Sequence, residues 1–271
     1  MRFTPFLVLM LLASIAGCMA KALPPVVVKI PSRTIHYQNE VKPILDKRCA
    51  VCHSCYNSPC QLKLGSWEGI ARGATKALVY DGTRLLEAPP TRLFVDAQLP
   101  SQWRQKDFHP VLNERTPTPE NNLAASVLYR SLALKKAHPL PDEPVLSGAF
   151  DFSLDRAQTC ARLGEFDAYE RDHPLAGMPY GLPGLAPREL DVVTRWLATG
   201  APFDAAPAPP AHVARQVKDW EQFLNGSSLK EQLMSRYLYE HLFLGHLVFE
   251  DDAHHQSFRL VRSTTAPGKP V

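Results

Sequence analysis

The residues best suited to chemistry are cysteines and a histidine close to residue 50. Cys49-Ala-Val-Cys52-His53 has the C-x-x-C-H spacing of covalent haem c attachment. Two thiols three residues apart can form thioethers with the two vinyl groups of one porphyrin. The histidine that follows can direct its imidazole to the iron as the proximal ligand. The spacing therefore predicts one haem c per chain, tethered by Cys49 and Cys52 and ligated by His53.

Two metal sites and a set of disulfides compete with the haem interpretation. The run C-x2-C-x2-C-x4-C is one residue from an iron–sulfur spacing, and Gln61 stands where that motif has proline; its members are Cys49, Cys52, Cys55 and Cys60. Four thiolates can also bind zinc, and a pair of structural disulfides is the plainest use of such residues. Neither metal alternative explains the export signal described below, so haem c is favoured.

Three further cysteines remain if Cys49 and Cys52 hold haem, or four if Cys18 is neither removed nor acylated. Since Cys55, Cys60 and Cys160 cannot all pair, they predict one disulfide and one free thiol. The sequence does not choose among the three pairings. A disulfide would also keep spare thiols from attacking the haem vinyl groups.

A candidate sixth iron ligand lies far downstream, on a Gly- and Pro-rich run. This run is Met178-Pro-Tyr-Gly-Leu-Pro-Gly184, and a thioether on such a loop is the usual sixth ligand of a cytochrome c. The alternatives are that Met178 fills core space, that His173 is the ligand, or that the position is open to substrate. We therefore name His53 and Met178 as metal ligands and as the catalytic residues.

Two amphipathic segments are expected to position these ligands. Residues 37–48 place Val41, Ile44 and Leu45 on one helical face before the motif, and Pro43 predicts a kink or a late helix start. A second helix is predicted from Pro187 to Gly200, with an apolar stripe of Leu190, Val193, Trp196 and Leu197 and with Gly200 as its C-cap. Two such helices flanking a haem motif are the skeleton of a cytochrome c domain.

The rest of the chain completes a mainly α fold. We expect a cytochrome c-like domain over residues 37–204 with a loop-rich insertion at about 85–165, a Pro/Ala linker at 201–211 and a helical segment over 212–271. Within the insertion, residues 119–137 predict one helix, with a stripe of Leu123, Val127, Leu128 and Leu132, and residues 139–147 predict a Pro-rich loop. The last segment predicts helices at 212–224 and 229–249.

The predicted helix at 229–249 is unusual because residues 237–249 are apolar almost all round. Such a helix is usually buried, or it contacts lipid or an acyl chain, and it is too short to cross a bilayer. Glu240, His241 and His246 within it are expected to be hydrogen-bonded core groups rather than ligands. Because this helix has no obvious partner in the sequence, we expect the chain to continue in a longer protein.

The first 20 residues predict export. Arg2 and the apolar run 5–17 have the pattern of a secretory signal. Residues 15–18 also fit a lipoprotein box, in which Cys18 would become an acylated N-terminus; cleavage after Ala20 is the alternative. Both predict a periplasmic protein, lipid-anchored only in the first case, and haem c attachment also takes place after export.

Composition excludes several classes of protein. The chain has 271 residues, 45% of them apolar, and four Trp, which excludes wholesale disorder. The 30 Lys and Arg against 27 Asp and Glu give a formal charge of +3, too small and too scattered for a nucleic-acid partner. The 25 Pro and 14 Gly predict many loops.

Four stretches of this chain resemble the bacterial fatty acid cis–trans isomerase family; they are residues 37–65, 150–156, 173–184 and 237–249. The resemblance implies a periplasmic haem c enzyme that converts cis double bonds of unsaturated fatty acyl chains to trans without shifting them. It implies acyl chains or phospholipids as partners, peripheral membrane contact, no soluble nucleotide cofactor, and a membrane-stiffening stress response. The resemblance also implies considerably longer family members, so we expect the chain to be similar to their N-terminal portion.

Two other classes of function use the same features. An electron-transfer cytochrome c domain would need only the Cys49–His53 motif and the Met178 loop. A lipid-anchored structural or sensing module would need Cys18. The stretches outside the haem motif, together with the apolar run at 237–249, favour the isomerase.

Overall fold

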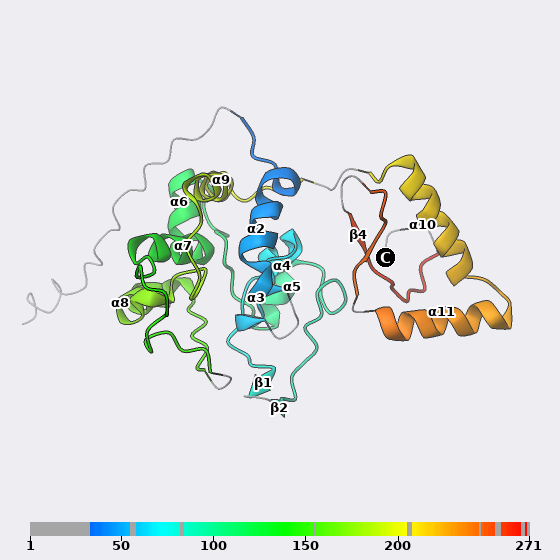
Figure 1. Cartoon of the computed structure of the whole chain (residues 1–271), viewed down its shortest axis with the longest axis horizontal. Helices are drawn as coiled ribbons and strands as arrows, with labels where there is room; N and C mark the ends of the chain where they lie inside the picture. Colours follow the sequence, from blue (N-terminus) through cyan, green and yellow to red (C-terminus); the bar gives the residue numbers. More distant parts are fainter. Residues whose placement is uncertain are drawn as a thin grey trace, which may run out of the picture. The chain divides into compact units, whose positions relative to one another are not determined.

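The computed structural model describes residues 33–54, 58–81, 84–153, 156–204, 208–243, 245–252, 256–266 and 269. The predicted signal segment, Cys18 and Cys55 lie outside these ranges, as do residues 205–207 of the predicted linker. The chain divides into two compact units, residues 1–204 and 205–271 (Figure 1). The described elements are mostly helices with four two-residue strands, so the predicted mainly α class is confirmed.

The haem motif follows a short helical run at the start of the first unit. A π turn, η2 (Tyr37–Val41), leads into α2 (Lys42–Arg48) and then α3 (Ala50–His53). Pro43 lies in the first turn of α2, where a missing N–H costs no intrahelical bond. The late helix start that Pro43 predicted is therefore confirmed.

The middle of the first unit consists mainly of short helices joined by loops. The elements are η3 (Pro59–Gln61), α4 (Trp67–Arg72), β1 (Tyr80–Asp81), β2 (Arg84–Leu85), α5 (Pro100–Gln105), α6 (Pro119–Ala124) and α7 (Val127–Ala137). The strands pair antiparallel, Tyr80 with Leu85 and Asp81 with Arg84. Residues 139–147 contain no regular element, as predicted.

The prediction of a single helix at 119–137 is wrong, because the helix is interrupted between α6 and α7. Ser126 has extended backbone angles, and its Oγ accepts a hydrogen bond from the N–H of Tyr129 at 3.1 Å. The same Oγ donates to the carbonyl of Val111 at 3.0 Å. A serine that caps the following turn competes with helix continuation, and here the cap ends one helix and begins another.

The first unit closes with α9, which packs on the helices that precede the haem motif. The final elements are η4 (Leu163–Glu165), α8 (Phe166–Asp172), η5 (Pro174–Ala176) and α9 (Pro187–Ala198). Trp196 of α9 is fully buried, its ring lies 5.6 Å from that of Tyr37, and its Nε1–H donates to the carbonyl of Pro202 at 2.9 Å. α9 also lies beside α6, where the Asn122 amide donates to the carbonyl of Ala198 at 2.9 Å (Figure 1). The predicted helix is therefore confirmed, although its C-cap is Thr199 rather than Gly200, and the stripe residues Val193, Trp196 and Leu197 are buried while Leu190 is half-buried.

The second unit is a helical hairpin followed by a small strand pair. Its elements are α10 (Ala211–Leu224), α11 (Leu229–Leu242), β3 (Leu247–Val248) and β4 (Ser257–Phe258), and β3 pairs antiparallel with β4. Ser228 and Glu231 form a capping box that starts α11. The helix at 212–224 is confirmed, but the prediction that helix 229–249 continues to residue 249 is wrong, because residues 247–248 pair as a strand.

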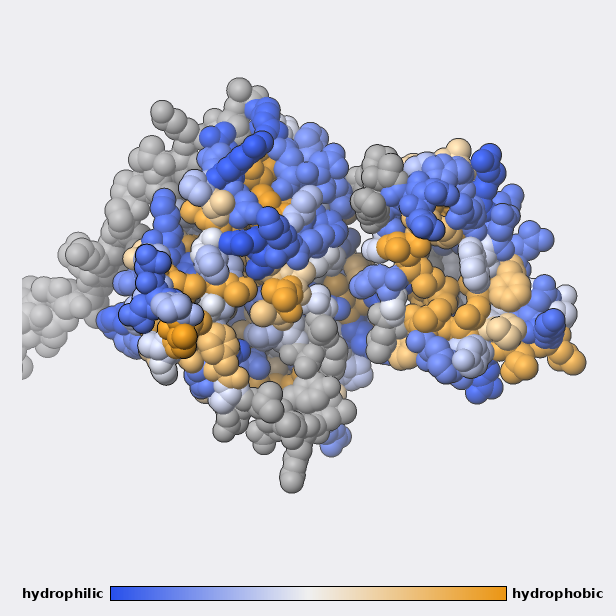
Figure 2. Space-filling view, in the orientation of Figure 1, coloured by the Kyte–Doolittle hydropathy of each residue, from blue (hydrophilic) through white to orange (hydrophobic). Residues whose placement is uncertain are grey.

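Of the two alternatives for residues 237–249, burial in a core or contact with lipid or an acyl chain, burial is not what the structure shows. No residue of α11 is buried, and Leu229, Leu233, Tyr237 and Val248 are all exposed. Figure 2 shows apolar side chains gathered on the visible face of this unit. The side chains of Glu240, His241 and His246 are exposed rather than in a core; Glu240 pairs with Arg236 at 2.7 Å, and the His241 ring lies against that of Tyr237. In the described part of the chain no helix has the length and apolarity to span a membrane.

Candidate functional site

The two thiols of the C-x-x-C-H motif are free and separated by one helical turn. Cys49 caps the end of α2, and its carbonyl accepts from the N–H groups of Cys52 at 3.1 Å and His53 at 3.0 Å. Positions three residues apart in a helix lie on the same side of it. Cys52 is exposed and Cys49 half-buried, and burial raises the pKa of the Cys49 thiol to about 11. The Cys49 thiol therefore stays protonated near neutral pH, and the Cys52 thiol is open to solvent.

His53 is held in the tautomer that a metal ligand requires. The imidazole is buried, and its Nδ1 lies 3.1 Å from the carbonyl oxygen of Leu62. A carbonyl can only accept, so Nδ1 carries the proton and Nε2 keeps its lone pair. Histidine ligands characteristically donate their other N–H to a carbonyl in this way. Burial lowers the pKa of His53, which keeps the ring neutral as ligation demands.

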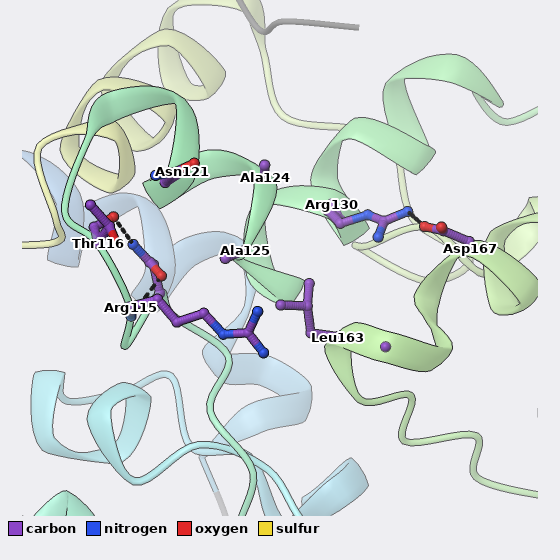
Figure 3. A pocket seen from close by; sticks show the side chains of 10 residues that line it. Arg115, Thr116, Asn121, Ala124, Ala125, Arg130, Leu163 and Asp167 are labelled. Atoms are coloured by element: carbon purple, nitrogen blue, oxygen red, sulfur yellow. Dashed lines mark hydrogen bonds and ion pairs between the residues drawn. The ribbon is translucent and has the colours of Figure 1, made fainter. Parts of the chain in front are cut away.

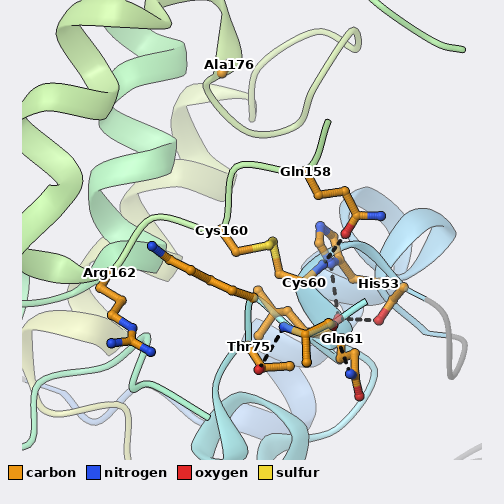
Figure 4. The surroundings of a disulfide bond; sticks show 12 residues. His53, Cys60, Gln61, Thr75, Gln158, Cys160, Arg162 and Ala176 are labelled. Atoms are coloured by element: carbon orange, nitrogen blue, oxygen red, sulfur yellow. Dashed lines mark hydrogen bonds between the residues drawn. A yellow bond between two sulfur atoms is a disulfide. The ribbon is translucent and has the colours of Figure 1, made fainter. Parts of the chain in front are cut away.

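The segment that presents the Leu62 carbonyl is fixed by a disulfide. Cys60 is bonded to Cys160, 100 residues away, and the N–H of Cys60 donates to the amide oxygen of Gln158 at 3.0 Å (Figure 4). The structure thus selects one of the three pairings that the sequence left open. It also removes Cys60 from a four-thiolate iron–sulfur or zinc set, while Cys49 and Cys52 stay unpaired.

Buried polar contacts at Gln61 hold the same segment. Cys60 and Gln61 have positive φ angles of 57° and 48°, which are uncommon for residues with a side chain. The guanidinium of Arg72 donates to the carbonyl of Gln61, and the Thr91 hydroxyl donates to its amide oxygen at 2.7 Å. These two supports could not be predicted from the sequence, because Arg72 and Thr91 are residue types that usually lie on the surface.

Met178 is half-buried, and its backbone is anchored to α7. Its N–H donates to the carbonyl of Ser131 at 2.9 Å, and its peptide bond to Pro179 is cis. Gly177 approaches α7 so closely that a Cβ at this position would lie 2.3 Å from the backbone nitrogen of Lys135. The loop that begins at Met178 therefore starts from a fixed point on α7. His173, the alternative ligand, is exposed, and its ring lies against Tyr169.

The far end of the Met178 loop is tied to the haem motif. Arg48, the residue before Cys49, donates to the carbonyl oxygens of Pro183 at 3.0 Å and Gly184 at 2.6 Å. Its Nε lies 3.5 Å from a carboxylate oxygen of Glu189 in α9. The structure thus brings the C-terminal end of this loop to the motif that carries Cys49 and Cys52.

An aromatic segment packs against the middle of the Met178 loop. The Tyr180 ring lies 5.7 Å from that of Phe150 and 5.5 Å from that of Phe152, and its hydroxyl accepts from the N–H of Asp151 at 2.9 Å. Gly181 has a φ of +63°, and the Phe152 ring occupies the place where its Cβ would be. Phe152 is nevertheless exposed, so this segment gives the loop an apolar rim.

A hollow of about 360 Å³ lies elsewhere in the first unit. It is lined by Asn113, Arg115, Thr116, Asn121, Ala124, Ala125, Arg130, Leu163, Gly164 and Asp167. Figure 3 shows Arg115 extending into it, while Arg130 pairs with Asp167 at 2.6 Å. None of the predicted haem ligands lines this hollow, so the hollow and the donor set are separate features. Within the described ranges, no three His, Cys, Asp or Glu side chains group around a common metal position.

Comparison with known families yields one match. A family model described as fatty acid cis/trans isomerase (CTI) matches residues 88–271, about two thirds of the chain. The match includes the Met178 loop and the second unit, and it begins after His53. Searches of curated proteins and of solved structures found no match.

Proposed function

This chain belongs to the fatty acid cis/trans isomerase family, and we propose that it takes part in the conversion of cis double bonds in unsaturated fatty acyl chains to trans at a covalently bound haem c. The family supports fatty acyl substrates. The haem proposal rests on one observation: the Cys49 and Cys52 thiols are free, and the neutral His53 ring beside them is oriented by the Leu62 carbonyl.

The residues present fit a haem c. Cys49 and Cys52 would form the thioethers, His53 would ligate through Nε2, and the Met178 thioether would be the sixth ligand or would give way to substrate. Packing of Trp196 in α9 on Tyr37 supports a cytochrome c-like arrangement of the first unit. When bound, a ferric haem c would supply a reversible one-electron acceptor: the electron withdrawn from the carbon–carbon double bond would lower the bond order and would be returned after rotation, so that no net oxidant and no soluble nucleotide cofactor would be consumed.

The roles of the chain's own side chains follow from their surroundings. The Leu62 carbonyl keeps the His53 ring oriented, and the Cys60–Cys160 disulfide holds the segment that supplies this carbonyl. A methionine ligand raises the iron potential, which favours electron withdrawal from an alkene. The apolar rim at Phe152 suits a hydrocarbon chain better than a polar substrate.

We place this reaction in the periplasm, with acyl chains of membrane lipids as substrates and peripheral contact with the membrane. The signal pattern in residues 1–20 supports export, with Cys18 available for lipidation. The exposed apolar side chains of α11 and β3 support contact with acyl chains or a lipid surface.

The test is the fatty-acid composition of cells that express the exported, full-length gene product. Cys49→Ala and His53→Ala should abolish trans acyl chains, whereas the exposed His173→Ala should not. A haem c spectrum of each purified variant separates loss of haem from loss of activity. Haem c attached to a wild-type protein that forms no trans product would favour the electron-carrier function, and trans product without haem c would refute the haem proposal.

A further inference from the structure

A buried lysine lies directly behind the Met178 loop. Lys135, in the last turn of α7, is only 3% exposed, whereas the next residue, Lys136, is exposed. A Cβ on Gly177 would lie 2.3 Å from the Lys135 backbone nitrogen, and one on Gly184 would lie 3.5 Å from its Cγ. Both ends of the loop therefore contact this one residue, the Gly177 end through the Lys135 backbone and the Gly184 end through the Lys135 stem.

The charged end of Lys135 has no protein partner. Among the residues that the structure describes, none forms a hydrogen bond or an ion pair with its ammonium group, although that nitrogen retains some contact with solvent. Burial lowers the pKa of Lys135. A position near the C-terminus of α7 favours a cation, but Lys136 shares that end of the helix and stays in water. A lysine held with a buried stem and an unpaired ammonium is suited to an incoming anion.

We propose that the Lys135 ammonium binds a carboxylate at the Met178 loop. This inference rests on the proposed function, which brings two carboxylate-bearing molecules to the loop: haem c, through its propionates, and a free fatty acid. Both offer the same chemistry, a carboxylate beside an apolar body. The stem of Lys135 would follow the apolar part while its ammonium pairs with the charge.

The experiment compares Lys135→Met, Lys135→Arg and the matched control Lys136→Met in the exported, haem-loaded protein. Lys→Met keeps the length and apolar volume of the stem, and the control removes the same formal charge from the neighbouring residue. Two quantities are measured: the midpoint potential of the haem, and the affinity for a cis-unsaturated fatty acid as free acid and as methyl ester.

Two results support the proposal and identify the source of the carboxylate. If a propionate is bound, Lys135→Met lowers the potential relative to Lys136→Met, and Lys135→Arg restores it. If a fatty acid is bound, Lys135→Met weakens free-acid binding about tenfold or more and leaves methyl-ester binding unchanged. Equal potentials and equal free-acid affinities in the two Met variants would overturn the proposal.

The proposed function can fail separately. A wild-type protein without haem c would sink the haem proposal, and the comparison of free acid with methyl ester would still test Lys135. The thermal unfolding temperature of each variant is also measured, so that a loss of binding caused by misfolding can be recognised.

Discussion

Arg48 donates a hydrogen bond of 2.6 Å to the carbonyl oxygen of Gly184, 136 residues further along the chain. The bond joins the residue before Cys49 to the end of the loop that begins at Met178. The predicted haem tethers and the loop of the predicted sixth ligand are therefore positioned by one guanidinium, which also lies 3.5 Å from Glu189 at the start of α9.

Loss of this guanidinium should loosen the Met178 loop. Arg48→Met removes two hydrogen bonds from a charged donor, and we expect the free energy of unfolding of the first unit to fall by about 1–3 kcal/mol. Thermal or urea unfolding measures the change. The control is Lys47→Met, since Lys47 is 72% exposed and 4.0 Å from Glu189. Equal effects of the two substitutions would show that the carbonyl contacts contribute little.

The two glycines that flank the loop should respond differently to alanine. Gly177→Ala places a Cβ 2.3 Å from the backbone of Lys135, so the loop must move off α7, at a cost of about 1–3 kcal/mol. Gly184→Ala meets only the Lys135 Cγ at 3.5 Å, an ordinary contact. Unfolding free energies, together with the visible spectrum of the haem form, check the loop. A Gly177→Ala protein as stable as Gly184→Ala would contradict the anchoring of the loop on α7.

Removal of the disulfide should destabilise the first unit strongly. Replacing both Cys60 and Cys160 by alanine releases a cross-link between residues 100 positions apart, and such a loop predicts a loss of about 2–5 kcal/mol. Thermal unfolding without reductant measures the effect. Cys55→Ala is the control, because Cys55 is the remaining candidate for the free thiol. Destabilisation by Cys55→Ala as large as that of the double variant would show a different pairing.

The acid stability of the first unit should depend on Glu40. The Glu40 carboxylate accepts hydrogen bonds from the Arg33 guanidinium at 2.7 and 2.9 Å and from the N–H of His36 at 3.0 Å. The hydrogen bonds from Arg33 are the main reason why the pKa of Glu40 is lowered from 4.5 to about 2. A depressed carboxyl pKa gives stability that is present above the unfolded pKa and is lost as the pH falls toward the folded pKa. The relevant window is therefore between about pH 4.5 and about pH 2.

Glu40→Gln should reduce the pH dependence of the free energy of unfolding between about pH 4.5 and about pH 2. We expect a difference from wild type of about 1 kcal/mol, since Arg33 lies mostly in solvent and surface ion pairs contribute little. Denaturant unfolding at a series of pH values provides the comparison, and Arg33→Met should reproduce most of the effect. A Glu40→Gln protein with the pH dependence of wild type would refute the role of this carboxylate.

Local features of this protein could be predicted from its sequence because their causes lie within a few residues. The start of α2 just before Pro43, the span of α9 and the mainly α class depend on helix periodicity and on residues at helix ends. The family was identified by resemblance, which the match over residues 88–271 confirms. The haem ligands stay predictions, and the contacts of His53 are consistent with them.

The predicted helix boundaries were wrong where another interaction competed with continuation of the helix. The helix predicted at 119–137 broke because the Ser126 hydroxyl caps a new turn. The helix predicted to run to residue 249 stopped at Leu242, since residues 247–248 found a strand partner at 257–258. Apolarity alone also misjudged the burial of α11, because burial requires a packing partner and not only an apolar composition.

The sequence by itself identified the residue types that could do chemistry and predicted the helices α9 and α10. The tertiary structure alone decided that Cys60 pairs with Cys160, that Arg48 donates to the carbonyl of Gly184, and that Lys135 contacts both ends of the Met178 loop. The interactions that form a helix join residues a few positions apart, so they can be predicted from the order of residues. Contacts between distant residues depend on the packing of the whole unit, because only that packing offsets the entropy of closing long loops.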